Sequence, residues 1–373
     1  MRIAQLANFV GPRSGGMKTA VEALGAGYAA AGVRRLLVMP GLRDATFSTE
    51  AGDVVQLRGP RVGGGYRVIL EPWRVIEVLE EFAPTSVEVS DKSSMLPVSG
   101  WARRNGVGSV LLSHERLDAM VSLRTGWRTA ANSPVSALNR LLVRRFDAVV
   151  VTSSFARSEF ATIAAAAGTP LHQVALGVDL DTFRPVPPDH RADETLRLVH
   201  AGRLSREKSP HLAVAAAVAL HRRGVPVRLD VYGAGPHRKE LELLAGDAPV
   251  VFHGLVTGRA ELSRRLAEAD VALSVCPGET FGLSVLEALA SGTPVVTADA
   301  GGARELVDET CGAWAAPDPD AIADAVLGLA ARPVTGRRTA ARARAEEYPW
   351  SRTVEAMLAL HADAPGLLGR RGA

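Results

Sequence analysis

Two glutamates, Glu279 and Glu287, are the strongest chemical signal in the sequence. Val271–Val275 is a short apolar run typical of a buried strand, and the glycine-containing loop after it carries Glu279. Glu287 falls in the predicted helix Leu283–Ala290, among apolar residues, where a carboxylate needs a partner. Ligands of open α/β sheets bind at the carboxyl ends of the strands, so two carboxylates there could accept hydrogen bonds from sugar hydroxyls. The spacing alone is equally consistent with no ligand, with Glu287 on a solvated helix face and Glu279 in an ordinary loop.

A second candidate group lies on the loop Gly202–Ser209, directly before a predicted helix. Arg203 offers a planar fork of hydrogen-bond donors, and Lys208 offers a compact positive charge. Because helix N-termini also favour anions, this combination would suit a diphosphate. The simpler interpretation is a capped loop with surface charges.

Three further positions could contact a ligand. Gly15 and Gly16 precede the first predicted helix, where unhindered backbone N–H groups could approach a phosphate or an acceptor. His114, and His253 with Gly254, each follow a predicted strand. Turns also need glycine, and a lone histidine is often structural, so spacing alone leaves these positions open.

Alternating strands and helices place these residues at strand ends in both halves of the chain. This alternation predicts α/β architecture with parallel, helix-covered sheets. The predicted strands are Arg2–Asn8, Arg35–Met39, Ser86–Val89, Ser109–Leu112, Ala148–Val151, Arg197–Ala201, Val227–Tyr232, Val250–Phe252, Val271–Val275 and Val295–Ala298. The predicted helices include Met17–Ala31, Trp73–Phe82, Pro134–Phe146, Pro210–Arg222, Leu283–Ala290 and Ser351–Leu360. With 373 residues the chain exceeds one ordinary domain, and the proline-rich segment Thr182–Asp193 is the predicted linker.

The ordered motifs resemble one enzyme family. The stretch from Glu279 to Glu287 matches an E-x7-E pattern, Gly301–Glu305 matches G-G-x-x-E, and Gly202–Lys208 matches G-R-L-x-x-E-K. Together they resemble family 4 retaining glycosyltransferases of GT-B fold. The resemblance implies two Rossmann-like domains with parallel sheets facing across a cleft: an acceptor domain (residues 1–183), a nucleotide-sugar domain (184–346) and a C-terminal helix (347–373) that crosses back to the first.

The resemblance also implies a role for each candidate residue. Arg203 and Lys208 would neutralise the departing diphosphate in place of a metal ion, while Glu279 would bind the transferred sugar and Glu287 the ribose. His114 would reach the reacting face. Further donor contacts are implied for Gly15, Gly16, His253, Gly254, Phe281, Gly282 and Leu283. Since the sequence offers no obvious nucleophile, we expect front-face attack by the acceptor, and we expect no cofactor beyond the sugar-nucleotide co-substrate.

The sequences of Ser113–Asp118 and Glu279–Glu287 are most similar to those of bacterial GDP-mannose-dependent transferases. This similarity favours GDP-mannose as donor, with a UDP-sugar as the alternative, and a hydroxyl of a glycolipid or of a small molecule as acceptor. Two other interpretations stay open: a GT-B-like sugar-nucleotide epimerase, which would need no acceptor, and a non-catalytic sugar-nucleotide binder.

Composition excludes several other classes of protein. A net charge of +3 with scattered arginines does not indicate nucleic-acid binding, and the first strand is not followed by the G-x-G-x-x-G of nicotinamide enzymes. Cys276 and Cys311 have no metal-type spacing, which favours a reducing cytosol. No run approaches the ~20 apolar residues that span a bilayer. We therefore expect a cytoplasmic enzyme that touches the inner face of the membrane if its acceptor is a lipid; the oligomeric state is not indicated.

Overall fold

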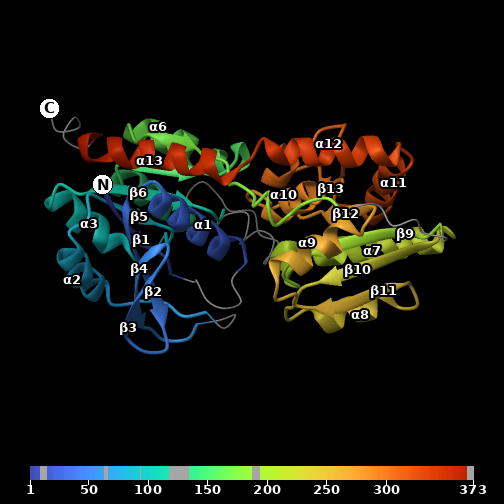
Figure 1. The fold of residues 1–373 in the computed structure, drawn as a ribbon, viewed down its shortest axis with the longest axis horizontal. Coiled ribbons are helices and arrows are strands. Elements are labelled where there is room, and N and C mark those ends of the chain that lie inside the picture. The colour runs from blue at the N-terminus through green and yellow to red at the C-terminus, as the bar shows by residue number, and fades with distance from the viewer. Residues whose placement is uncertain (9–14, 63–65, 93, 117–133, 187–193, 368–373) are drawn as a thin grey trace. The chain divides into compact units, whose positions relative to one another are not determined.

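The computed structural model describes residues 1–8, 15–62, 66–92, 94–116, 134–186 and 194–367 (Figure 1). The described residues form two compact units. Residues up to 116, 134–176 and 350–367 belong to the first unit, and residues 177–186 and 194–349 belong to the second. Each unit is an α/β domain, as the alternation of strands and helices predicts.

The sheet of the first unit has the order β3-β4-β2-β1-β5-β6-β7-β8. All neighbours are parallel except the β3–β4 hairpin. The strands are β1 (Arg2–Leu6), β2 (Arg34–Gly41), β3 (Ala45–Thr49), β4 (Gly52–Arg58), β5 (Ser86–Val89), β6 (Gly108–Ser113), β7 (Ala148–Val151) and β8 (Leu171–Gln173). The helices are α1 (Gly16–Ala30), α2 (Pro72–Phe82), α3 (Leu96–Arg104), α5 (Pro134–Arg145), α6 (Ser154–Ala167) and α13 (Trp350–Leu367).

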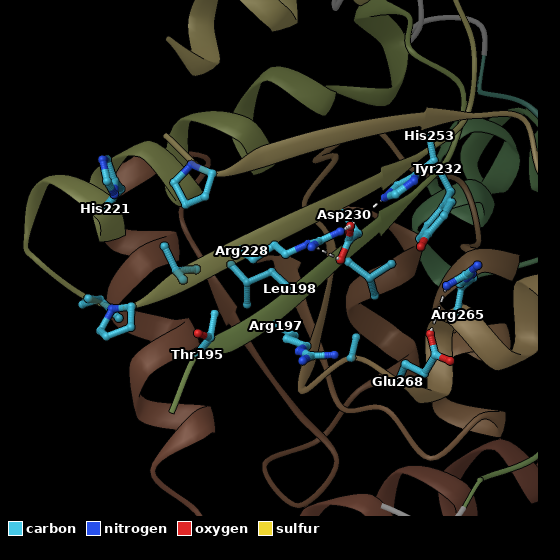
Figure 2. Close-up of a pocket in the computed structure, with 16 residues that line it drawn as sticks. Thr195, Arg197, Leu198, His221, Arg228, Asp230, Tyr232, His253, Arg265 and Glu268 are labelled. Carbon is cyan, nitrogen blue, oxygen red and sulfur yellow. Dashed lines mark hydrogen bonds and ion pairs between the residues drawn. The ribbon is translucent and has the colours of Figure 1, made fainter. Parts of the chain in front are cut away.

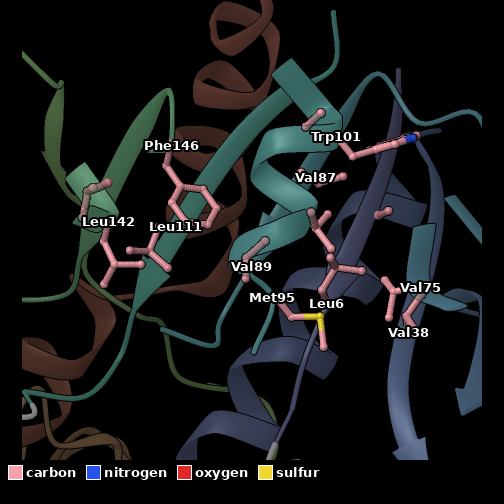
Figure 3. Packing of buried hydrophobic residues seen from close by; sticks show 14 of the residues in the cluster. Leu6, Val38, Val75, Val87, Val89, Met95, Trp101, Leu111, Leu142 and Phe146 are labelled. Atoms are coloured by element: carbon pink, nitrogen blue, oxygen red, sulfur yellow. The ribbon is translucent and has the colours of Figure 1, made fainter. Parts of the chain in front are cut away.

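The central strands of this sheet are buried on both faces, so helices must cover both sides. One core packs α2, α3, α5 and α6 against the sheet, with Met95, Trp101 and Phe146 among its larger side chains (Figure 3). The opposite face packs α1 and α13 through residues such as Tyr28 and Met357. The central strands are therefore held from two sides, which fixes the positions of the loops at their carboxyl ends.

The C-terminal helix α13 belongs to the first unit, as predicted. His361 of α13 is fully buried, its Nδ1 atom 2.8 Å from Ser86 Oγ and its Nε2 atom 3.2 Å from Glu88 Oε2. Tyr28 Oη donates to the same Glu88 carboxylate at 2.7 Å. A Cβ atom on Gly27 of α1 would lie 2.2 Å from Val354, so glycine permits α1 and α13 to approach closely.

The sheet of the second unit is parallel, in the order β11-β10-β9-β12-β13-β14. This order is that of a doubly wound Rossmann sheet, whose ligand-binding switch point lies between β9 and β12. The strands are β9 (Leu196–Ala201), β10 (Val227–Tyr232), β11 (Val250–Gly254), β12 (Val271–Ser274), β13 (Val295–Ala298) and β14 (Gly312–Ala315). The helices are α7 (Pro210–Arg222), α8 (Arg238–Ala245), α9 (Arg259–Ala267), α10 (Leu283–Ala290), α11 (Pro319–Ala330) and α12 (Val334–Glu346).

The unit boundaries correct the predicted ones. The sequence placed the first boundary at 183/184 within a linker, but the structure places it at 176/177. Val178 N–H donates to Tyr348 O at 2.9 Å, and Arg342 Nη1 donates to Phe183 O at 2.8 Å. Phe183 is fully buried. The described part of the predicted linker therefore packs into the second unit, and residues 187–193 lie outside the described residues. The last boundary lies at 349/350 rather than 346/347.

Candidate active site

The switch point of the second sheet brings two predicted residues into direct contact. Lys208 ends a short 3₁₀ helix after β9, and Glu279 lies on the loop after β12. Lys208 Nζ lies 2.7 Å from Glu279 Oε2. Burial opposes the charge of Lys208, but Glu279 outweighs burial and raises the pKa of Lys208 above its ordinary value. The site therefore holds a compact ion pair whose cation stays protonated.

The glycines of the G-G-x-x-E element let two loops meet behind Glu279. Gly302 N–H donates to Glu279 O at 2.6 Å. Gly301 has φ +91°, and a Cβ atom there would lie 2.9 Å from Pro277 O and 3.1 Å from Glu279 O. Only glycine fits this conformation and this space without strain. The element therefore fixes the backbone that carries the Glu279 carboxylate.

The N-terminus of α10 supplies backbone donors beside this pair. Gly282 caps the helix with φ +105°, and a Cβ atom there would lie 3.1 Å from Ala303 Cβ. The first N–H groups of a helix, here from Leu283 onward, have no partner within the helix and carry partial positive charge. Phe281 is buried, so its side chain supports the loop and its contribution to a ligand would come from the backbone. This arrangement suits an anion.

Glu287 has the partner that its apolar surroundings require. Arg259 Nη2, at the start of α9, lies 3.2 Å from Glu287 Oε1. Burial raises the pKa of Glu287 to about 7, because the neighbouring Arg259 offsets burial only in part. The Arg259 guanidinium also lies 4.9 Å from the ring centroid of Phe183. Sequence reasoning missed Arg259, since it lies on another helix.

Arg203 lies on a loop that a second glycine turn supports. Its Nη1 atom lies 3.7 Å from Glu207 Oε1. Leu204 N–H donates to Ala234 O at 3.1 Å. A Cβ atom on Gly233 would lie 1.8 Å from Gly202 O, and one on Gly235 would lie 2.2 Å from Leu204 O. The glycines after β10 thus allow the two loops to pack, a role that their spacing after a strand could have suggested.

Cys276 joins the two loops of the switch point. Its Sγ atom donates to Glu207 O at 3.0 Å, and Ser209 Oγ lies 3.9 Å away. Burial raises the pKa of the Cys276 thiol to about 11, so the sulfur stays protonated. The thiol is therefore a hydrogen-bond donor that holds the Glu207–Lys208 segment against the Glu279 loop. In the sequence, Cys276 showed only the absence of metal-type spacing, so this contact was not predicted.

The side chain of His253 lines a separate groove of the second unit. Its ring stacks on Tyr232 with centroids 4.7 Å apart, and its Nε2 atom lies 2.6 Å from Asp230 Oδ1. These side chains line a groove of about 540 Å³ on the open face of β9 and β10, together with Arg197 and Arg265 (Figure 2). Arg203, Lys208, Glu279 and Glu287 do not line this groove. Gly254, by contrast, accepts the Gly233 N–H at 2.7 Å and so supports the Arg203 loop.

The remaining candidates lie on the first unit, at the carboxyl ends of β1 and β6. His114 follows β6, and its Nε2 atom is 3.9 Å from Glu115 Oε1. Burial lowers the pKa of His114, which favours the neutral imidazole. Gly15 and Gly16 are exposed at the start of α1, and a Cβ atom on Gly15 would meet nothing within 4 Å. No neighbouring atom therefore excludes a side chain at residue 15; Ser14 lies outside the described residues.

Comparisons with known proteins identify the family. Residues 195–332 match the family model "Glycosyl transferases group 1", and residues 15–177 match "Glycosyl transferase 4-like domain". The GDP-mannose-dependent alpha-(1-6)-phosphatidylinositol dimannoside mannosyltransferase of Mycobacterium tuberculosis is 42% identical over 369 residues, covering 96% of this chain and 95% of that protein. A GDP-mannose-dependent alpha-(1-6)-phosphatidylinositol monomannoside mannosyltransferase of Mycolicibacterium smegmatis is 30% identical, covering 74% and 77%. The chain belongs to the family 4 glycosyltransferases, and it is a glycosyltransferase, as predicted.

Solved structures confirm the predicted GT-B fold. Sucrose-phosphate synthase from Thermosynechococcus elongatus superposes with a TM-score of 0.78 at 20% identity, over 97% of this chain and 98% of that chain. An Anabaena protein in complex with UDP and glucose superposes with a TM-score of 0.75 at 18% identity, over 97% and 99%. At these identities the likeness concerns the fold alone.

Proposed function

We propose that this enzyme transfers mannose from GDP-mannose to a hydroxyl of a mannosylated glycolipid, with retention of anomeric configuration. The similarity to the Mycobacterium tuberculosis mannosyltransferase over nearly the whole chain supports both the donor and the acceptor class. The main structural support for the proposed reaction is the Lys208–Glu279 pair, 2.7 Å apart, at the switch point of the second sheet. A cation, a carboxylate and a helix N-terminus at one strand edge fit a sugar diphosphate.

Lys208 and Arg203 are proposed to bind the diphosphate. Negative charge grows on the leaving diphosphate as the glycosidic bond breaks, so fixed cations and N–H dipoles there lower the barrier. Lys208 is already positioned by Glu279, and the raised pKa of Lys208 keeps it charged. When the diphosphate shares the lysine, Glu279 can accept hydrogen bonds from hydroxyls of the transferred sugar. No metal or cofactor is needed in this scheme, and activity that persists with a chelator would test that.

Glu287 is proposed to accept hydrogen bonds from the two ribose hydroxyls. Its carboxylate is largely buried and is held by Arg259 at 3.2 Å. An ionised carboxylate offers acceptors at both oxygens, whereas the protonated form turns one of them into a donor. Ribose binding should therefore favour the ionised form and release the proton that burial retains in the unliganded protein.

The proposed reaction is a front-face displacement. The acceptor hydroxyl oxygen forms a bond to the anomeric carbon while the bond from that carbon to the diphosphate oxygen breaks. The hydroxyl proton moves to the departing phosphate oxygen, and GDP leaves. His114, with its lowered pKa, would act as a neutral hydrogen-bonding group for the donor sugar. Since attack and departure use the same face, the product keeps the configuration of the donor.

A surface of the first unit supports peripheral contact with a membrane. Residues 42–62 and 66–74 are tied together by bonds such as Arg74 Nη2 to Asp44 Oδ1 at 2.8 Å. Large apolar side chains are exposed here: Leu42, Phe47, Val62, Leu70 and Trp73. The same segments carry five arginines (Arg43, Arg58, Arg61, Arg67 and Arg74) and four carboxylates (Asp44, Glu50, Asp53 and Glu71), of which Asp44 and Glu71 pair with Arg74. Apolar side chains with arginines suit an anionic lipid surface. None of the helices in the described part of the chain is long and apolar enough to cross a membrane.

The deciding experiment incubates the purified enzyme with GDP-mannose, UDP-glucose or UDP-GlcNAc and a phosphatidylinositol mannoside acceptor in vesicles. We expect an α-linked mannosyl product from GDP-mannose alone, with the anomeric configuration read by NMR. A β-linked product would contradict retention. Conversion of the donor in the absence of any acceptor would instead favour an epimerase, and binding without turnover would favour a sugar-nucleotide binder.

A further inference from the structure

A buried lysine lies beside the loop that carries His114. Lys92 follows β5, the neighbour of β6 in the first sheet, and its side chain is only 8% exposed. Its Nζ atom lies 3.0 Å from Oε2 of Glu159 on α6, a side chain that is 2% exposed. The other oxygen of this carboxylate accepts from Asn139 Nδ2 of α5 at 3.0 Å. The pair is thus held between two helices and a strand end.

The same ammonium group reaches the His114 loop. Lys92 Nζ donates to Glu115 O at 2.5 Å, and it lies 4.9 Å from the ring centroid of Phe160. One side chain therefore connects α6 to the main chain next to His114. Arg116, the next residue along, is also tied to α6, since its Nη1 atom donates to Phe155 O at 3.0 Å and to Ser158 Oγ at 2.9 Å. Lys92, which follows β5, binds the main chain at Glu115 itself.

A buried ion pair is an expensive way to stabilise a fold. Removing two charges from water costs several kcal/mol per ion, and apolar side chains of equal volume often give equal or greater stability. The Lys92–Glu159 pair is therefore better explained by what it holds in place than by stability. The position that it holds is the backbone of His114–Glu115.

We propose that Lys92, oriented by Glu159, is a positioning residue that fixes the His114–Glu115 backbone so that the imidazole is presented to the donor sugar. The proposal rests on the proposed role of His114 in mannosyl transfer. Lys92 itself does not contact the substrate in this scheme; it acts through the carbonyl of Glu115.

Electrostatics give the positioning residue a measurable signature. Burial is the largest cause of the lowered pKa of His114, and the charge of Lys92 lowers it further, while Glu115 and Asp91 raise it. Removing the Lys92 charge should therefore raise the pKa of His114 toward its ordinary value. The acid side of the kcat–pH profile should then move to higher pH.

The test compares variants of the full-length enzyme. Lys92→Met together with Glu159→Leu removes both buried charges, so neither is left without its partner. Lys92→Arg keeps the charge and the donors. Glu88→Gln is the matched control, because Glu88 is an equally buried carboxylate on β5 whose partners are on α1, α13 and β1 rather than on the His114 loop. His114→Ala reports on the underlying role.

We expect the double variant to lose about tenfold or more in kcat, a loss in transition-state positioning, with the KM for GDP-mannose within about threefold of wild type. The acid limb of its kcat–pH profile should shift to higher pH, and Lys92→Arg should recover most of the rate. Wild-type kcat and pH profile in the double variant, while His114→Ala is inactive, would overturn the positioning role and leave the proposed function intact. An equal loss in Glu88→Gln would reduce the effect to general destabilisation and also overturn it. Full activity of His114→Ala would overturn both the role of His114 and this proposal.

Discussion

The carboxyl edges of the two sheets are built differently. In the second unit, charged side chains are paired at the surface of the site, as in Lys208–Glu279 and Arg259–Glu287. In the first unit, the charges lie behind the site: Lys92 and Glu159 are buried and hold the backbone next to His114. The difference suggests that the second edge binds an anionic donor directly, whereas the first edge presents a neutral group whose position matters more than its charge.

The largest effect is expected at the charged edge. Lys208→Ala should lower kcat by about 10²–10³-fold, the range for loss of one fixed group that stabilises developing charge. It also leaves Glu279 facing the diphosphate without its cation. Initial rates with GDP-mannose would measure the loss. Lys239→Ala, at an exposed lysine on α8 of the same unit, should keep wild-type activity. Similar rates for both variants would remove Lys208 from the donor site.

The backbone behind Glu279 should be nearly as sensitive. Gly301→Ala places a Cβ atom 2.9 Å from Pro277 O at φ +91°. We expect about 1–3 kcal/mol of destabilisation from strain, and a fall in kcat as Glu279 moves. Urea unfolding and initial rates would measure both. Gly328→Ala in α11, where a Cβ atom meets nothing within 4 Å, is the control and should be neutral or stabilising. A fully active, fully stable Gly301→Ala would contradict the proposed loop contact.

Glu287 should make donor binding depend on pH. Its pKa of about 7 is raised in the folded protein, so its contribution to stability is fully present below the ordinary carboxyl pKa and is lost as the pH rises through 7. Binding of GDP to the ionised form requires loss of that proton. The Kd for GDP should therefore be about tenfold weaker at pH 6 than above pH 8, as measured by calorimetry. Glu287→Gln should bind weakly at every pH; a pH-independent Kd in the wild type would contradict the ribose assignment.

The smallest effect is expected at Gly15, at the carboxyl edge of the first sheet. A substitution there distinguishes an effect on stability from an effect on donor binding. Gly15→Ala adds a Cβ atom to open space, so steric crowding within the protein should not lower Tm. If the backbone at Gly15 approaches the donor, the KM for GDP-mannose should rise by about threefold to tenfold, the cost of one crowded or lost hydrogen bond. An unchanged KM would leave Gly15 as an ordinary helix start.

The sequence was informative where the site is contiguous. The segment from Val271 to Glu305 was predicted as strand, loop, helix and strand, and the structure follows it closely. What the sequence did not reveal depends on residues distant along the chain. Arg259 reaches Glu287, Cys276 reaches Glu207, and Lys92 reaches Glu115 only because separate elements pack together. No local pattern encodes those pairings.

Two other local patterns did not show how their side chains are packed. Prolines and charges near residue 183 are typical of a linker, yet Phe183 is buried and Arg342 bonds its carbonyl. The turn His253-Gly254 gave no sign of what the imidazole would contact, and its partners Asp230 and Tyr232 lie on another strand. In both places the environment of the side chain is set by tertiary packing, which local composition does not reveal.

The most direct test of the central claim is the binding of GDP to wild type and Lys208→Ala, measured by calorimetry in the presence of a metal chelator. Wild type should bind GDP more tightly than UDP without metal, and Lys208→Ala should lose most of this affinity while remaining folded. Equal affinity of the two proteins for GDP, or binding that requires a divalent cation, would contradict the assignment of the diphosphate to the Lys208–Glu279 pair.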